Sequence, residues 1–397
     1  MAIIRYILPA LAIASSVAAQ CSVGITTITA TSQSIPCSTL NGSVAIATDI
    51  SGTVQIDGIQ VITGNLSAQN NAALSGIEAN DLQAVGGLAL GNLTTLSALE
   101  MPVLSQVNVV NFTALPELQT MSFGTTIQKA VSILITNTQL TTLTGINVSS
   151  VNTFNINNNP ALTTIDMQLT VLTGPLVIEG NGYGHNITAS FVDLITAQNM
   201  TFRNCTEVLL PSLANVTQDL GFYGNSFQTF SAPNLTTAGG LIFNDNVDLT
   251  NISLPSLTSI NATYQIANNT QLKVIDGFQK LSVIRGALDF SGNFTNVTLP
   301  SLTDVAGGFN MQTSGQFDCS PFQNYKTDQV IKGTFVCSGS ESKPGTAGTS
   351  PSSTSTSTST AKKGAAGQIQ VNVLTMVGVP ALMCGISFVA GLLRLVL

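Results

Sequence analysis

The chain has 397 residues, of which 44% are hydrophobic and only 8% charged, and its formal net charge at pH 7 is -7. A diffuse acidic charge argues against a nucleic-acid partner, because nucleic acids are held by clusters of Lys and Arg.

Residues 1–19 have the layout of a cleaved secretory signal peptide. They carry one basic residue, Arg5, then an apolar stretch from Tyr6 to Ile13. Small residues typical of a cleavage site follow at Val17 to Ala19. We therefore expect the mature chain to begin near Gln20 and to fold in an oxidising compartment.

A short apolar-x-apolar strand recurs about every 22 residues between residues 44 and 311. Such a period is typical of a solenoid, in which each repeat buries its apolar face only against its neighbours. We predict about 13 coils within residues 20–337. The second apolar residue of each strand is expected in the core: Ile46, Ala68, Leu90, Val109, Ile135, Ile156, Ile178, Phe202, Phe222, Phe243, Ile266, Phe290 and Met311.

A small polar residue follows many of these strands, three positions after the second apolar residue. This is the L-x-L-x-x-N/C pattern of leucine-rich and related solenoids, in which an inward side chain satisfies buried backbone carbonyls. The predicted ladder comprises Asn71, Asn159, Asn181, Cys205, Asn225, Asn246, Asn269 and Asn293. The register fails at Leu93, Phe112 and Thr138, and the spacings around Val109 are 19 and 26 residues. We therefore expect a bulged or looped coil there.

The segments between the strands favour turns and short extended pieces over helices. They are rich in Thr, Ser, Asn and Pro, as in the Leu-Pro-Ser-Leu stretches at residues 210–213, 254–257 and 299–302, and poor in Lys, Glu and Arg. The predicted fold class is therefore an all-β solenoid, either a right-handed β-helix or a leucine-rich-repeat-like stack.

Four cysteines bracket the predicted solenoid, Cys21 and Cys37 at its start and Cys319 and Cys337 at its end. Four cysteines permit three pairings. We favour pairing within each end, because it would staple terminal coils that lack a neighbour on one side. The remaining Cys205 could be a nucleophile, a metal ligand or a dimer bridge, but its ladder position favours a structural role.

The sequence changes character twice after Cys337. Residues 338–363 form a Ser/Thr/Gly/Pro tract, which cannot build a core and is typical of an extended, O-glycosylated stalk. Residues 364–397 place small residues, a polar spacer and an apolar tail in the order of a glycosylphosphatidylinositol (GPI) attachment signal. We predict attachment at Gly364, with Ala365 and Ala366 as alternatives. A plain transmembrane helix is the competing interpretation of the tail.

Secretion would expose the fifteen Asn-x-Ser/Thr sequons of the mature chain to N-glycosylation. Asn204 and Asn293 are sequons that we do not predict as glycan sites, and we expect Asn293 to be buried and unmodified because it belongs to the predicted ladder. The predicted glycan sites are Asn41, Asn65, Asn92, Asn111, Asn147, Asn186, Asn199, Asn215, Asn234, Asn251, Asn261, Asn268 and Asn296.

Enzymes that hydrolyse glycosides need two carboxylates that face each other across the scissile bond. The outward residue of each strand lies between its two apolar positions, which gives the row Ala45, Ser67, Ala89, Asn108, Leu134, Asn155, Val177, Thr201, Gly221, Ile242, Gln265, Asp289 and Asn310. Asp289 is the one carboxylate in this row.

Other catalytic and ligand-binding signals are weak. Asp245 and Asp248 flank Asn246 in a turn, where acidic residues are usually solvated or capping. His185 has no Cys or His at metal-ligand spacing and no Ser/Asp grouping beside it. We predict no catalytic residue, no metal site and no cofactor.

The order of these features resembles the fungal GPI-anchored cell-wall organisation proteins, including sporulation-specific wall proteins, which are built on receptor L-domain-like repeats. The matching stretches are Cys37–Ile46, Ile59–Leu66, the Leu-Pro-Ser-Leu repeats and the Ser/Thr stalk that ends at Lys362–Ala366. The resemblance covers the whole chain. It implies a role in wall assembly and integrity, with no catalytic residues to carry over.

We therefore expect a non-enzymatic glycoprotein held by its GPI lipid at the extracellular face of the plasma membrane, or transferred to the wall. Wall glucan, chitin or mannoprotein are the expected partners. Two alternatives stay open. A β-helix enzyme that modifies wall polysaccharide would gather carboxylates in one groove, and a receptor-like recognition module would expose an apolar or aromatic patch.

Overall fold

The computed structural model describes residues 21–124, 126–184 and 187–345, with side chains from residue 24 onward. All of them belong to the first of the two units into which the chain divides, residues 1–351. Among the described residues, no helix has the length and apolar character needed to cross a membrane. The predicted signal peptide, most of the stalk and the predicted GPI signal lie outside these ranges.

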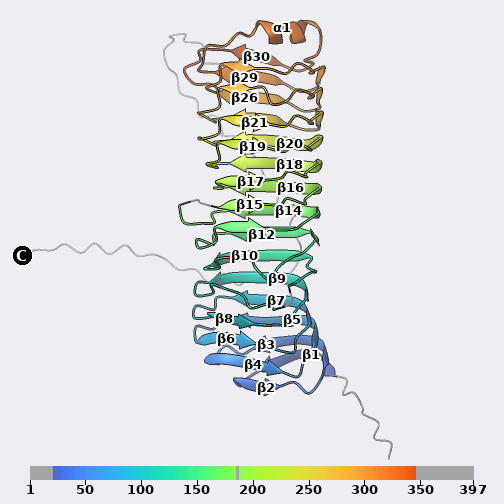
Figure 1. Cartoon of the computed structure of the whole chain (residues 1–397), viewed down its shortest axis with the longest axis vertical. Coiled ribbons are helices and arrows are strands. Elements are labelled where there is room, and N and C mark those ends of the chain that lie inside the picture. Colours follow the sequence, from blue (N-terminus) through green and yellow to red (C-terminus); the bar gives the residue numbers. More distant parts are fainter. Residues whose placement is uncertain (1–20, 125, 185–186, 346–397) are drawn as a thin grey trace, which may run out of the picture. The chain divides into compact units, whose positions relative to one another are not determined.

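Parallel strands stack one above another into a β-solenoid (Figure 1). The main sheet contains 19 strands. Fifteen of them are β1 (Cys21–Ile28), β3 (Thr39–Ile46), β5 (Val61–Gln69), β7 (Ala84–Gly91), β9 (Gln106–Leu115), β10 (Ser132–Thr138), β12 (Thr153–Asn157), β14 (Val171–Glu179), β16 (Thr196–Arg203), β18 (Asn215–Tyr223), β20 (Thr237–Asn244), β23 (Tyr264–Ala267), β26 (Leu288–Gly292), β29 (Phe309–Thr313) and β30 (Phe335–Ser338). The other four are two-residue pieces: β11 (Ser150–Val151), β22 (Ser259–Ile260), β25 (Val283–Ile284) and β28 (Asp304–Val305).

Shorter parallel strands lie on the returning half of the coils, and they form four separate sheets. These sheets are β2 (Ser32–Ser34), β4 (Gly52–Asp57), β6 (Leu74–Glu78) and β8 (Ala98–Glu100); β13 (Thr164–Asp166), β15 (Thr188–Ser190) and β17 (Glu207–Leu209); β19 (Thr229–Ser231) and β21 (Asn251–Ser253); and β24 (Val274–Ile275) and β27 (Asn296–Val297). Between β8 and β13 the described returning segments make only isolated bridges, such as Ile127 to Ile146.

Strand register confirms the predicted period and corrects one coil. Phe112 of β9 aligns with Leu90 of β7 and with Ile135 of β10. Phe112 is fully buried, whereas Val109 is 42% exposed. The spacings become 22 and 23 residues, so the predicted bulged coil is wrong. The error arose because apolar residues of β9 lie on both faces of the strand, so that alternation did not identify the inward ones. Asn111 rather than Asn108 occupies the outward row.

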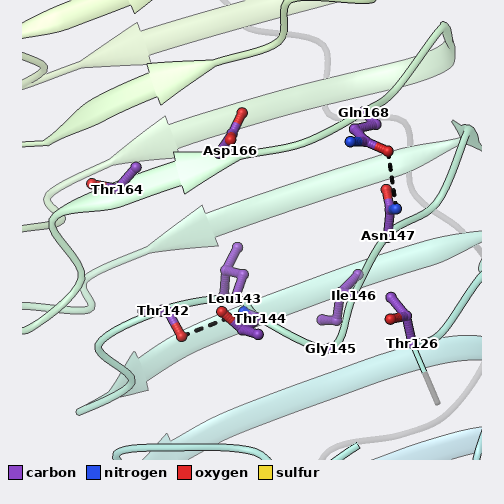
Figure 2. Close-up of a pocket in the computed structure, with 10 residues that line it drawn as sticks. All are labelled: Thr126, Thr142, Leu143, Thr144, Gly145, Ile146, Asn147, Thr164, Asp166 and Gln168. Atoms are coloured by element: carbon purple, nitrogen blue, oxygen red, sulfur yellow. Dashed lines mark hydrogen bonds between the residues drawn. The ribbon is translucent and has the colours of Figure 1, made fainter. Parts of the chain in front are cut away.

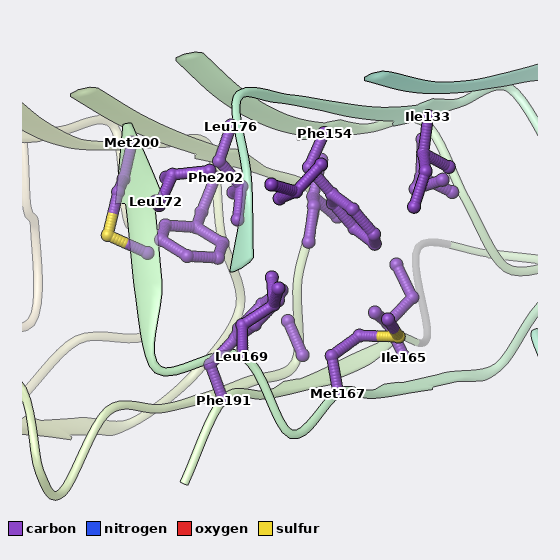
Figure 3. Packing of buried hydrophobic residues seen from close by; sticks show 14 of the residues in the cluster. Ile133, Phe154, Ile165, Met167, Leu169, Leu172, Leu176, Phe191, Met200 and Phe202 are labelled. Atoms are coloured by element: carbon purple, nitrogen blue, oxygen red, sulfur yellow. The ribbon is translucent and has the colours of Figure 1, made fainter. Parts of the chain in front are cut away.

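Aliphatic and aromatic side chains from every coil fill one continuous core. In the middle coils Phe202, Phe222 and Phe243 stack nearly parallel, with centroid separations of 5.5 and 4.9 Å. Figure 3 shows the adjoining coils, where Phe154 packs edge-on against Phe191. Burial of each such side chain stabilises the fold by about 1.5–3 kcal/mol, and stacked coils supply the partner surfaces that a single coil lacks.

The predicted asparagine ladder forms at the corner after the main-sheet strands. Asn246 is fully buried, and its Nδ2 donates to the Phe222 carbonyl and to Asn269 Oδ1, both at 3.1 Å. Asn246 Oδ1 in turn accepts the Asn225 backbone N–H at 3.0 Å. Asn246 thus satisfies two backbone groups of the preceding coil, and its own backbone N–H is satisfied by Asn269 of the next coil. The buried members of the ladder are Asn71, Asn159, Asn181, Cys205, Asn225, Asn246 and Asn269.

The ladder ends one coil earlier than predicted, because Asn293 is only half-buried. A residue with positive φ precedes the ladder residues of the earlier coils, for example Asn158 at 52° and Asp245 at 57°, and this left-handed residue turns the chain inward. Gly292 does not adopt that conformation. Strand β26 continues through it, and Phe294 enters the core instead.

Covalent and aromatic contacts close the two ends of the solenoid. Helix α1 (Ser320–Thr327) lies over β30 (Figure 1), and its buried Phe322 packs against Phe309 at 5.6 Å between centroids. A disulfide joins Cys319 to Cys337. At the other end Cys37 is disulfide-bonded, whereas the side chain of Cys21 lies outside the described part of the chain.

Candidate functional site

Asp289, the one carboxylate of the outward row, is locked in a buried network. Its two oxygens accept hydrogen bonds from Gln265 Nε2 at 3.0 Å and from Asn310 Nδ2 at 2.8 Å, and it is only 3% exposed. Segment 339–345, called the strap below, bonds to this network through Gly345. The Gly345 carbonyl accepts from Asn310 Nδ2 at 2.8 Å, and its N–H donates to Gln312 Oε1 at 3.1 Å. A substrate therefore has no access to Asp289.

In the part of the chain that the structure describes, the other groups that the sequence singled out do not come together. Asp245 and Asp248 are exposed turn residues on either side of the buried Asn246. His185 lies outside the described residues. Within the described ranges, no three His, Cys, Asp or Glu side chains come together in a way that could hold a metal ion.

Cys205 is free and fully buried. Its N–H donates to Asn225 Oδ1 at 2.9 Å, and its Sγ lies 3.6 Å from the Arg203 carbonyl. Burial raises the pKa of the thiol to about 12. The neutral thiol is a poor nucleophile and metal ligand, so the geometry favours the structural reading of Cys205.

A shallow polar cleft lies where the returning strands are interrupted between β8 and β13. Its volume is about 380 Å³. Figure 2 shows Thr164 and Asp166 on one coil and Asn147 on the coil before it, with Asn147 Nδ2 donating to Gln168 Oε1 at 3.0 Å. Asp166 is the one charged residue of this lining and accepts a hydrogen bond from Ser190 Oγ at 3.0 Å. The cleft offers hydroxyl, amide and carboxylate groups without a cation.

A second surface cluster lies on the main sheet, and sequence reasoning missed it. Arg203 Cζ lies 4.4 Å from the centroid of the Tyr223 ring, and Arg203 Nε lies 3.8 Å from Glu179 Oε2. These residues follow the second apolar position of β14, β16 and β18, so the repeat would have predicted that they form a row. Their types, one acid, one base and one aromatic, gave no recognisable motif.

The predicted glycan sites are mostly accessible, apart from Asn186, which lies outside the described residues. Asn111, Asn199 and Asn215 are half-buried, as are the sequons Asn204 and Asn293. The exposed sites are Asn41, Asn65, Asn92, Asn147, Asn234, Asn251, Asn261, Asn268 and Asn296. The predicted anchor residue Gly364 also lies outside the described ranges.

Comparison with known proteins decides the family. The protein ecm33 of Aspergillus fumigatus is 39% identical over 365 residues, which cover 89% of this chain and 91% of that protein. The chain belongs to the Ecm33 family. The Ecm33 family model, described as GPI-anchored cell wall organization protein, matches residues 1–34.

Two further Ecm33 relatives carry the location in their names. A cell surface GPI-anchored protein of Arthroderma benhamiae is 37% identical, covering 87% of this chain and 90% of that protein. The cell surface GPI-anchored protein ECM33 of Candida albicans is 31% identical, covering 79% of this chain and 76% of that protein. Membership confirms the predicted resemblance, the GPI-anchored cell-surface location and the role in wall organisation. No solved structure gives a significant match.

Proposed function

We propose that this member of the Ecm33 family organises the cell wall without catalysis, as an anchored solenoid that binds wall polysaccharide. The observation that carries the proposal is the separation of the carboxylates on the main-sheet face. Glu179 lies on β14 and Asp219 on β18, and one strand, β16, lies between them in the sheet. Their separation along the solenoid axis is therefore about 10 Å, before any offset along the strands is added. Asp289 lies three further steps away, on β26.

This spacing disfavours the rival hypothesis of a wall-modifying enzyme. Retaining and inverting glycosidases place their two carboxyl groups about 5–9.5 Å apart. Strand spacing alone places Glu179 and Asp219 beyond that range. Asp289 is hydrogen-bonded and only 3% exposed, and Asp304 of β28 is paired with Lys332 at 2.7 Å. Binding, in contrast, requires only a surface with hydrogen-bonding side chains, which the solenoid offers along its length.

The anchored layout is part of the same proposal. Cleavage after residue 19 and lipid attachment at Gly364 would leave a solenoid on a Ser/Thr-rich stalk, and the exposed sequons would carry its N-glycans. Of the predicted stalk, residues 338–363, Ser338 belongs to β30 and residues 339–345 form the strap on the solenoid. Wall glucan, chitin or mannoprotein are the proposed partners. Support comes from the order of the sequence segments and from the names of the Ecm33 relatives.

The test is a binding and product-release assay with the mature anchored protein. Purified in detergent, it is passed over immobilised β-glucan, chitin and mannan, and the eluates are analysed for released oligosaccharides. We expect retention on at least one matrix without products, and the same result for Asp289→Asn. Oligosaccharide release that is lost in Asp289→Asn would establish the enzyme instead. A protein that no matrix retains would contradict polysaccharide binding.

A further inference from the structure

The cluster around Tyr223 belongs to a longer row of outward side chains, called the Tyr223 row. It consists of Asn157, Glu179, Arg203, Tyr223 and Asn244, one residue each from β12, β14, β16, β18 and β20. Strand pairing aligns Asn157 with Glu179, Arg203 with Tyr223, and Tyr223 with Asn244. Adjacent members therefore stand about 4.8 Å apart along the solenoid.

Tyr223 is unusual among the aromatic residues of this protein. Of those that the structure describes, only Tyr183 and Tyr223 are neither buried in the core nor packed against it. Tyr223 lies on the broad face of the main sheet, where a Cβ added to Gly221 would come within 2.6 Å of its ring. Gly221 thus leaves the space that the ring occupies, and Arg203 stacks against the ring from the preceding coil.

Tyr223, Arg203 and Glu179 keep hydrogen-bonding groups at the surface, whereas the Asn157 amide is already bonded to Thr136 and Asn155. Burial raises the pKa of the Tyr223 hydroxyl, the Arg203 charge lowers it by less, and the Asp219 carboxylate raises it. The hydroxyl therefore stays a donor at neutral pH. The side chains of Arg203 and Glu179 remain 42% and 51% exposed. Their contact at 3.8 Å leaves donors and acceptors available at the surface.

We propose that the Tyr223 row is a binding track for an uncharged, β-linked pyranose chain, an inference that rests on the proposed polysaccharide binding. Arg203 and Glu179 neutralise each other, so the row presents no unpaired cation for an anionic ligand. An aromatic ring and adjacent carboxylate, guanidinium and amide groups match the C–H face and the hydroxyls of a sugar. The strand spacing also approximates the length of one pyranose unit in an extended chain.

The Tyr223 row, whose members are half-buried apart from the exposed Glu179, is not explained by stability alone. An exposed ion pair and a surface cation–π contact stabilise a fold only weakly. The middle coils already hold a stacked phenylalanine core and a buried asparagine ladder beneath the same strands. The polar cleft of Figure 2 is the weaker candidate, because none of its lining residues is aromatic.

The test measures sugar affinity in matched variants of the mature anchored protein, freed of N-glycans. Laminarihexaose and chitohexaose are titrated by calorimetry, with an α-linked mannan oligosaccharide as comparator. We expect Tyr223→Ala to weaken binding of a β-linked probe about tenfold and Tyr223→Phe to preserve it within about twofold. Glu179→Ala, which leaves core packing intact, should weaken it severalfold. Tyr183→Ala, which removes an exposed tyrosine outside the row, is the control.

Each outcome decides a different point. Loss in Tyr223→Ala and Glu179→Ala, with an unchanged Tyr183→Ala and unchanged melting temperatures, supports the track. Equal binding by all variants overturns the track and leaves polysaccharide binding at another surface. Binding of the α-linked comparator alone overturns the β-linked assignment. A wild-type protein that binds none of the soluble probes and is retained by none of the immobilised polysaccharides overturns the proposed function itself.

Discussion

The middle coils and the C-terminal coils share one sheet but differ in what their outward side chains contact. In the middle, Thr201 and Ile242 of the outward row remain partly exposed. In the last coils, Asp289 and Asn310 are bonded to each other and at most 5% exposed, and Gly345 of the strap bonds to Asn310. The same repeat position is thus partly exposed to solvent in one region and buried in the other.

This difference shows how a solenoid ends. A middle coil is flanked by coils on both sides, and the ladder residues bond to each in turn. The last coil has a neighbour on only one side. Helix α1, the Cys319–Cys337 disulfide and the strap replace the missing neighbour, and the asparagine ladder has already ended by this point.

The largest expected effect is a loss of stability when the asparagine of the ladder position is replaced in a middle coil, with almost no loss in a C-terminal coil. Asn246→Ala removes a fully buried side chain and leaves the Phe222 carbonyl and the Asn225 N–H without partners. We expect it to lower the free energy of unfolding by about 3–5 kcal/mol. Asn293→Ala, at the same repeat position in a later coil, should change it by less than about 0.5 kcal/mol. Urea unfolding of both variants measures the difference.

Equal losses in these two variants would contradict the early end of the ladder. They would mean that Asn293 enters the core in solution, as the repeat pattern predicts. N-glycan mapping offers an independent check, because an Asn293 that enters the core would stay unmodified while the exposed Asn296 carries a glycan.

Removal of the C-terminal disulfide should have the next largest effect. The double variant Cys319→Ser with Cys337→Ser opens a link between residues 18 apart, and we expect a loss of about 3 kcal/mol in the free energy of unfolding. Hydrogen exchange should accelerate in β29 and β30 and stay unchanged in β18 and β20. Uniform acceleration along the solenoid would show that the two regions unfold as one unit.

The smallest expected effect concerns Cys205 in the middle coils. Its pKa is about 12 in the folded protein and 9.0 for an ordinary thiol. Above pH 9 the unfolded chain loses this proton while the folded chain keeps it, so the stabilisation is complete below pH 9 and declines as the pH rises towards 12. At pH 10 the expected loss is about 1.4 kcal/mol.

Cys205→Ala is the matched control for this pH dependence. It removes the thiol, so its urea midpoint should fall less steeply between pH 9 and pH 10 than that of the wild type. Parallel pH profiles of the two proteins would contradict the burial of a neutral thiol at this position.

Much of the fold could be predicted from the sequence, and the errors have physical causes. The positions of Phe222 and Asn246 followed from alternation and period, because burial on one face imposes both. Val109 was misplaced because β9 is apolar on both faces. Asn293 was misplaced because its burial depends on the backbone conformation of Gly292, which composition does not reveal. The candidate site was predicted less well, since Tyr223 matches no motif.

The sequence by itself determined the solenoid, the inward positions and the ladder, because these depend on contacts that repeat with every coil. The tertiary structure alone decided which outward side chains meet. Arg203 and Tyr223 become neighbours only when β16 and β18 stack in register. Asn310 donates a hydrogen bond to the carbonyl of Gly345, 35 residues later in the chain. A periodic pattern can place Arg203 and Tyr223 in one row, but it carries no information about the return of Gly345, because that contact depends on how a segment outside the repeats packs.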